Sequence, residues 1–248
     1  MCIRDSGNTA DLDFDGFSFA GRVYFDTVDT SQGPLVEAAF LDKSSSVGLS
    51  FERIEPDISG APSADTTTLD LRFVGQSDFI LEIGIEKLDN ELFDFEETTL
   101  SAGVGIYLND NTDLIFTLST FDEADANQLQ LEAHSLVSLR GDSAFSYDLG
   151  IAYFDADGFS STELNIAMNY FFNTQFSIGA NYDLSNGDGL DESTLGFGAD
   201  WFITPNFRMA FAYTMEEIEV EVEDFDGDFE IETDGFSIAI GGLSLIHI

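Results

Sequence analysis

The chain has 248 residues and a formal net charge of −40, with 48 acidic residues against 8 Lys and Arg. This charge excludes a nucleic-acid-binding surface, which needs clustered basic residues to contact phosphates. Because 44% of the residues are apolar and 25 are Phe, a disordered acidic tail is also excluded, and no run of about 18 apolar residues exists to form a transmembrane helix.

The two ends of the chain do not read as parts of a natural protein. "MCIRDS" and "LSLIHI" are encoded by one DNA sequence and its reverse complement, which is identified as a transposase adapter used in sequencing libraries. We therefore expect residues 1–6 and 243–248 to be adapter-derived, and residues 7–242 to be a single domain truncated at both ends. We also expect that a signal peptide is lost by this truncation.

Along the chain, the dominant pattern is strict alternation of apolar and polar residues, which indicates strands with two unlike faces. Clear examples in chain order are "FILEIGIEK" (79–87), "LSAGVGIYL" (100–108), "ELNIAMNYFF" (163–172) and "FRMAFAYT" (207–214). We count about fourteen such strands, most near the roughly 9 to 11 residues that a tilted strand needs to cross a bilayer.

The connections between these strands alternate in kind. Short turns are expected at residues 43–46, 75–78, 109–112, 140–143, 173–175 and 204–206. Longer acidic loops are expected at residues 55–67, 88–97, 122–127, 155–161, 185–193 and after Met215. Short turns would gather at one rim and long loops at the other, which predicts an antiparallel up-and-down meander with unlike ends.

The apolar face could be the core of a soluble sandwich or solenoid, or it could face lipid. Lipid is favoured because no charged residue interrupts the middle of this face in the clear strands. Its aromatic residues also gather beside the short turns, as an interfacial girdle requires. These predicted membrane-interface residues are Phe40, Phe73, Phe79, Phe145, Phe172, Phe176, Trp201 and Phe207. The fold class is therefore an all-β transmembrane β-barrel.

At this point the chain resembles the Gram-negative outer-membrane porins and related barrels. The resemblance rests on hairpins such as "NYFFNTQFSIGANYDL" (169–184) and "GFGADWFITPNFRMAFAYT" (196–214), where aromatic-bounded strands meet at a tight turn. It implies an outer-membrane location with lipid and lipopolysaccharide as neighbours, passive diffusion of small hydrophilic solutes, and short turns on the periplasmic side. A full-length barrel of sixteen strands and a homotrimer are compatible with it, but monomer and trimer stay open.

The Pro-Glu-Phe-Gly motif of enterobacterial constriction loops is absent, so the resemblance does not extend to an infolded loop. The C-terminal aromatic residue that closes the last strand of such barrels is also absent, which the adapter explains by truncation.

The parity of the strands assigns a set of charged residues to the lumen. These are Asp70, Glu82, Glu86, Glu132, Asp148, Glu163, Asp183 and Asp200, with Arg22, Arg72 and Arg208. Acidic residues in the lumen and in the extracellular loops raise the local cation concentration, so we predict cation preference. Arg72 and Arg208 lie close to short turns and are expected to form a basic cluster near the periplasmic mouth.

The remaining sequence motifs give weaker predictions. Asp224, Asp226 and Asp228 could bind Ca²⁺ or Mg²⁺ weakly through clustered oxygens, although a solvated loop is the simpler interpretation, and no other cofactor is expected. No set of acid, base and nucleophile emerges around His134, so no enzyme activity is expected. The apolar parity switches between Met215 and Ile218 and again between Ile231 and Phe236, which predicts a bulge on each strand of a hairpin that extends past the membrane.

Two alternatives to a porin remain. A non-conducting structural or surface-interaction barrel would act through acidic loops that bind divalent cations. A soluble acidic protein of halophile type would also account for the acid excess, which itself indicates a saline or marine habitat more than a ligand.

Overall fold

The computed structural model describes residues 2–5, 8–11, 14–56, 63–91, 95–156, 158–187, 190–204, 207–221 and 228–241. The strands and short helices in these ranges are β1 (Cys2–Asp5), β2 (Asn8–Asp11), β3 (Phe14–Tyr24), η1 (Leu35–Glu37), α1 (Ala38–Leu41), β4 (Ser46–Pro56), β5 (Ala64–Val74), β6 (Phe79–Asn90), β7 (Phe95–Asn109), β8 (Thr112–Phe121), β9 (Ala126–Ser138), β10 (Ala144–Ala156), β11 (Phe159–Phe171), β12 (Phe176–Gly187), β13 (Leu190–Thr204), β14 (Phe207–Glu221) and β15 (Asp228–Gly241).

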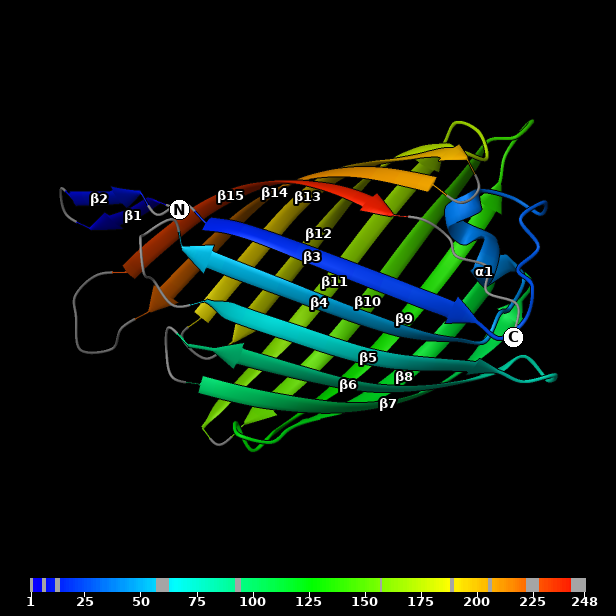
Figure 1. Ribbon diagram of the computed structural model, residues 1–248. Coiled ribbons are helices and arrows are strands. Elements are labelled where there is room, and N and C mark those ends of the chain that lie inside the picture. Colours follow the sequence, from blue (N-terminus) through cyan, green and yellow to red (C-terminus); the bar gives the residue numbers. More distant parts are fainter. Residues whose placement is uncertain are drawn as a thin grey trace.

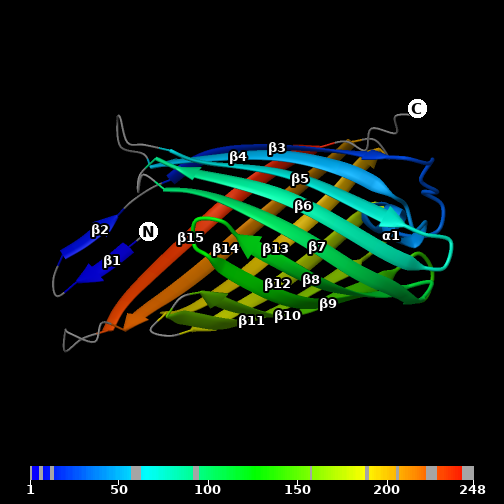
Figure 2. The ribbon, with the colours of Figure 1, turned by 90° about the horizontal axis from the view of Figure 1, so that it is seen from below.

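The strands from β3 to β15 form one antiparallel meander in which each strand pairs with its neighbours in sequence. The sheet curls into a barrel shape (Figures 1 and 2), with β3 at one edge and the β1–β2 hairpin attached to β15 at the other. The paired sheet is not closed, because its order runs from β2 to β3. The all-β, antiparallel, up-and-down fold that the sequence predicts is confirmed.

The meander contains thirteen strands, and the difference from the expected fourteen lies in one segment. Alternation predicted a strand before a turn at residues 43–46, with Phe40 on its lipid face. The prediction of this strand is wrong, because residues 35–41 form η1 and α1 instead. We call the whole connection between β3 and β4, residues 25–45, the inner segment.

The two rims differ less than the sequence suggested. Among the described residues, the short-turn rim carries residues 75–78, 110–111, 139–143 and 172–175, together with the inner segment. At the opposite rim the strands extend into the expected acidic loops, so that β10 and β11 are separated only by residues 157–158. The expectation of long loops is wrong at residues 122–127, 155–161 and 185–193, because backbone pairing continues into these segments and leaves only two to four residues between the strands.

The bulges predicted in the last hairpin are also wrong. β14 and β15 pair without interruption from Arg208 opposite Gly241 to Glu221 opposite Asp228. The apparent change of parity arises because Met215 is the last apolar residue on the outer face of β14, and Glu217 follows it there. The predicted extension of this hairpin exists as regular strand.

The outer face of the sheet is apolar and exposed. Mid-strand side chains such as Val104, Phe116 and Ile151 are 49%, 45% and 52% exposed. Such a surface would be unfavourable in water, and it is the band that lipid covers in transmembrane barrels.

The buried core lies inside the barrel, at the short-turn rim. Ile80, Tyr107 and Ile115 form one buried cluster, and Leu136, Ala144 and Phe171 form another. Phe40 packs against both clusters. The prediction that Phe40 faces the membrane interface is therefore corrected: its ring is inside the barrel, because α1 turns its apolar side to the inner wall.

Candidate functional site in the barrel lumen

The inner segment crosses the short-turn end of the lumen. Its backbone N–H at Leu35 donates to the carbonyl of Thr174 (2.8 Å), in the turn between β11 and β12. At its other end, the Ser45 hydroxyl accepts from the backbone N–H of Val74 in β5 (2.9 Å). Both views place α1 at this end of the barrel (Figures 1 and 2). The segment thus reaches from one side of the barrel wall to the other.

Lys43 attaches the inner segment to two neighbouring turns. Its ammonium group donates to Asp78 (2.8 Å) and Asp110 (3.1 Å). The hydrogen bond to Asp78 raises the pKa of Lys43 above its ordinary value. The charge of Lys43 is therefore held at neutral pH, and it fastens the end of the segment to the rim.

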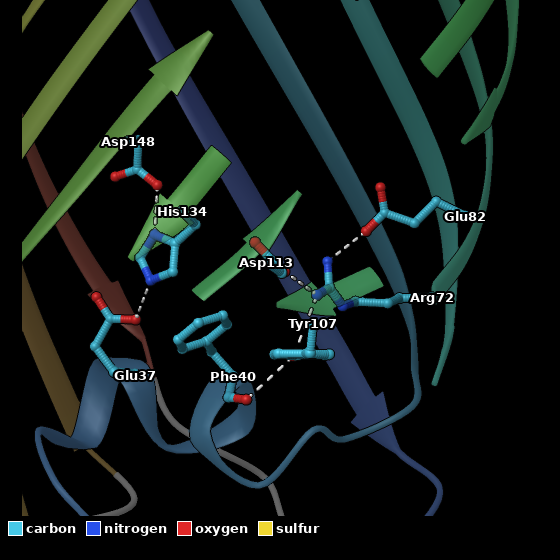
Figure 3. Close-up of polar contacts among 8 residues, drawn as sticks. All are labelled: Glu37, Phe40, Arg72, Glu82, Tyr107, Asp113, His134 and Asp148. Carbon is cyan, nitrogen blue, oxygen red and sulfur yellow. Dashed lines mark hydrogen bonds and ion pairs between the residues drawn. The ribbon is translucent and has the colours of Figure 1, made fainter. Parts of the chain in front are cut away.

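His134 on β9 lies between two carboxylates, as Figure 3 shows. Its Nδ1 is 2.5 Å from Asp148 on β10, and its Nε2 is 3.1 Å from Glu37 of the inner segment. Ionised carboxylates only accept hydrogen bonds, so the two contacts together require a proton on both ring nitrogens. The ring also packs edge-on against Phe40, with centroids 4.3 Å apart.

Arg72 on β5 is the centre of a second cluster (Figure 3). Its guanidinium group pairs with Glu82 (2.5 Å) and Asp113 (2.7 Å) and donates to the Tyr107 hydroxyl (3.3 Å). The Tyr107 hydroxyl in turn donates to the carbonyl of Phe40 (3.1 Å). The side chain of Asp113 is only 4% exposed, so its charge depends on Arg72 for compensation.

The other predicted lumen arginines are also paired. Arg22 contacts Asp70 (2.8 Å) and Ser46 (3.0 Å). Arg208 forms a hydrogen bond and ion pair with Asp200. Arg22, Arg72 and Arg208 all lie within two residues of the short-turn end of their strands, and each has its own carboxylate partner. A shared basic cluster of Arg72 and Arg208 near the periplasmic mouth stays a prediction.

The remaining predicted carboxylates have neutral partners. Glu86 accepts from Thr68, Glu132 from Gln130, and Glu163 from Gln128, at 3.1, 2.9 and 3.0 Å. Asp183 accepts from the amides of Asn165 and Asn181. Within the described part of the chain, no ion pair joins these four carboxylates to a basic side chain.

The paired and unpaired groups meet at one cavity of about 380 Å³ inside the barrel. Arg22, Arg72, Glu82, Glu132 and Asp148 line it from the strands. Val36, Glu37, Ala39 and Phe40 line it from the inner segment. The structure thus brings five of the predicted lumen residues to one space.

Seven of the eight predicted interface aromatics lie on the outer face near the short-turn rim. Phe73, Phe79, Phe172, Trp201 and Phe207 are exposed there. Phe145 and Phe176 are half-buried, and their rings lie beside those of Tyr147 and Phe172. Their contact with the membrane interface stays a prediction.

Sequence reasoning missed Glu37, Tyr107 and Asp113 as lumen residues. A signal was nevertheless present, since both faces of several strands become apolar at the short-turn end. Ile80, Ile115, Leu136 and Phe171 occupy inner positions there. Apolar residues on the lumen-facing side of a barrel indicate that another apolar segment packs against them, and here that segment is α1.

The predicted weak metal site at Asp224, Asp226 and Asp228 lies outside the residues whose side chains the structure describes. Elsewhere in the described ranges, no group of three or more potential ligands is arranged to hold a metal ion. In those same ranges, no helix is long and apolar enough to span a membrane.

A curled antiparallel sheet with an apolar outer face and a charged, partly occupied interior defines a transmembrane β-barrel channel. The family described as "Putative general bacterial porin" matches residues 5–119 and 106–229. These matches cover most of the chain, and the chain belongs to this family of porins. It is a Gram-negative outer-membrane protein, and its family and fold are those of a channel and not of an enzyme.

Solved structures are similar in fold. The outer membrane protein Omp33 of Acinetobacter baumannii is 18% identical, with a TM-score of 0.54, covering 90% of this chain and 92% of Omp33. OccK7 (OpdD) of Pseudomonas aeruginosa is 11% identical, with a TM-score of 0.49, covering 80% and 82% of the two chains. The likeness to Omp33 supports the fold alone. No match is found among curated proteins.

Proposed function

We propose that this porin passes small hydrophilic solutes with a preference for cations. One observation carries the proposal: each lumen cation described above is compensated by at least one carboxylate, whereas Glu86, Glu132, Glu163 and Asp183 have neutral partners. The charge left uncompensated on the inner wall is therefore negative. A passing cation would be attracted to it and an anion repelled.

The position of these carboxylates favours the same preference. Glu86, Glu163 and Asp183 lie in the half of their strands nearer the opposite rim, away from the arginines. With a Debye length of about 10 Å at 0.1 M salt, fixed charges on the wall act across much of a lumen. A solute entering from the opposite rim would first meet carboxylates without a basic partner, and would meet the ion pairs of the arginines later.

The test is the ion selectivity of a charge-neutralised variant. Glu86→Gln, Glu132→Gln, Glu163→Gln and Asp183→Asn are combined, and the reversal potential is measured in planar bilayers under a KCl gradient. We expect a marked loss of cation preference. A matched control replaces Glu91, Asp122, Glu123 and Asp125, four exposed carboxylates of the opposite rim, with their amides.

The rim control should change selectivity less, because solvent screens exposed charges more strongly. Equal effects of the two sets would assign selectivity to the rim and contradict the proposal. A folded barrel that inserts and passes no ions in either form would favour the non-conducting alternative, in which acidic loops bind divalent cations.

A further inference from the structure

The inner segment is attached to the barrel differently from the other connections of the meander that the structure describes. Described connections such as residues 75–78 and 139–143 turn directly from one strand to the next at a rim. The inner segment also joins two adjacent strands, but it leaves β3, reaches the turn at Thr174 and returns to β4 through Ser45. It does not extend the sheet in its central part, where η1 and α1 occupy residues 35–41. It is held there by side-chain contacts and a few single hydrogen bonds.

Three strands of the inner wall present a row of charged groups to this segment. Asp113 on β8, His134 on β9 and Asp148 on β10 are directly opposite one another in the sheet register. Asp113 is compensated by Arg72, and His134 contacts both Asp148 and Glu37. Glu37 is the one acidic side chain within η1 and α1, and it is directed at this row (Figure 3).

The contact between Glu37 and His134 is well protected from solvent. The side chains are 11% and 20% exposed. Phe40 covers the pair from the same segment, with its ring against His134 and its carbonyl bonded to Tyr107. A charge-assisted hydrogen bond in such surroundings is stronger than a neutral one in water.

We propose that the inner segment is the constriction that sets the size of solute this porin admits, and that His134 is the positioning residue that holds the constriction in place through Glu37. The proposal rests on the porin function argued above. It assigns the restriction of solute size to the short-turn mouth and to the first connection of the described meander. Displacing the segment would remove Val36, Glu37, Ala39 and Phe40 from the lining of the lumen cavity.

The experiment compares four purified variants with the unaltered chain: Glu37→Gln, His134→Gln, the two combined, and Asp42→Asn. Single-channel conductance is recorded in planar bilayers, and the uptake of sugars of increasing size is measured in proteoliposomes. Asp42→Asn is the matched control, since it removes one negative charge from the same segment and the hydrogen bond it alters is to Ser44 of that segment. Heat-modifiable mobility on gels verifies that each barrel is folded.

Loss of a hydrogen bond between charged groups shifts an equilibrium by about tenfold or more. We therefore expect Glu37→Gln and His134→Gln to occupy a higher-conductance state about tenfold more often and to admit larger sugars. The combined variant should match the single variants, because both remove the same contact. Asp42→Asn should match the unaltered chain.

Other outcomes overturn the proposal. If Glu37→Gln and His134→Gln behave like Asp42→Asn while the unaltered chain conducts, the constriction is not held by this contact and the porin function stands. If the two effects add, the residues act separately and His134 is not the positioning residue. If every variant is folded and silent, both the constriction and the porin function fail.

Discussion

Removing Arg72 should be among the most destabilising single changes in this barrel. Its guanidinium group compensates Glu82 and Asp113, and the Asp113 side chain is 4% exposed. Replacement by Met keeps the apolar stem but leaves that buried carboxylate without a cation. Breaking a buried pair in this way costs about 3–5 kcal/mol. We expect Arg72→Met to lower the free energy of unfolding by that amount, measured by urea titration of the folded, heat-modifiable form in detergent.

Two further variants serve as a control and as a rescue for this prediction. Lys87→Met breaks an ion pair with Glu96 whose side chains are 52% and 65% exposed, so it should cost only about 0–1 kcal/mol. Adding Asp113→Asn to Arg72→Met should recover part of the loss, because no uncompensated buried charge then remains. The reasoning is refuted if Arg72→Met and Lys87→Met cost the same.

Four other variants test three separate features. Phe116→Arg places a cation on the outer face of β8 and should cost about 2–4 kcal/mol of barrel stability near the bilayer midplane. Thr117→Arg, on the inner face, should change ion selectivity instead. Equal losses of stability for the two variants in lipid vesicles would contradict the assigned faces. Glu97 accepts hydrogen bonds from the backbone N–H groups of Thr98, Glu123 and Ala124. Glu97→Ala should therefore lower stability by about 1–3 kcal/mol and speed proteolysis at residues 122–125. An unchanged rate of cleavage would show that Glu97 does not hold this loop. The pKa of Lys43 is raised by its bond to Asp78, so the stabilisation by Lys43 is complete below its unfolded pKa and is lost as pH rises through its folded pKa. Lys43→Met should therefore lower the free energy of unfolding by a constant amount, about 0–1 kcal/mol, from about pH 6 to 9, and this difference should shrink above about pH 10.4. A difference that shrinks within the neutral range would contradict this prediction.

The strands could be predicted because lipid imposes a strong rule on sequence. Every outward position in the bilayer must be apolar, so segments such as residues 79–87 and 100–108 alternate clearly, and their faces and pairing follow. The same parity placed Arg72, Asp148 and the other lumen candidates on the inner wall. What parity could not provide was which of these charges are compensated, because that depends on the register between strands.

The inner segment could not be predicted by the same rule. Residues 35–41 read "LVEAAFL", which is apolar enough for a strand and too short to be recognised as a helix. Its fold is decided by the apolar residues Ile80, Leu136 and Phe171 on the inner wall, and these are distant in sequence. Tertiary packing overrides local preference here.

The measurement that tests the central claim most directly is the reversal potential of the unaltered protein in planar bilayers under a KCl gradient. Uncompensated carboxylates at Glu86, Glu132, Glu163 and Asp183 predict a potential directed toward the cation equilibrium value. A potential of zero, or one directed toward the anion value, would contradict the account of this lumen.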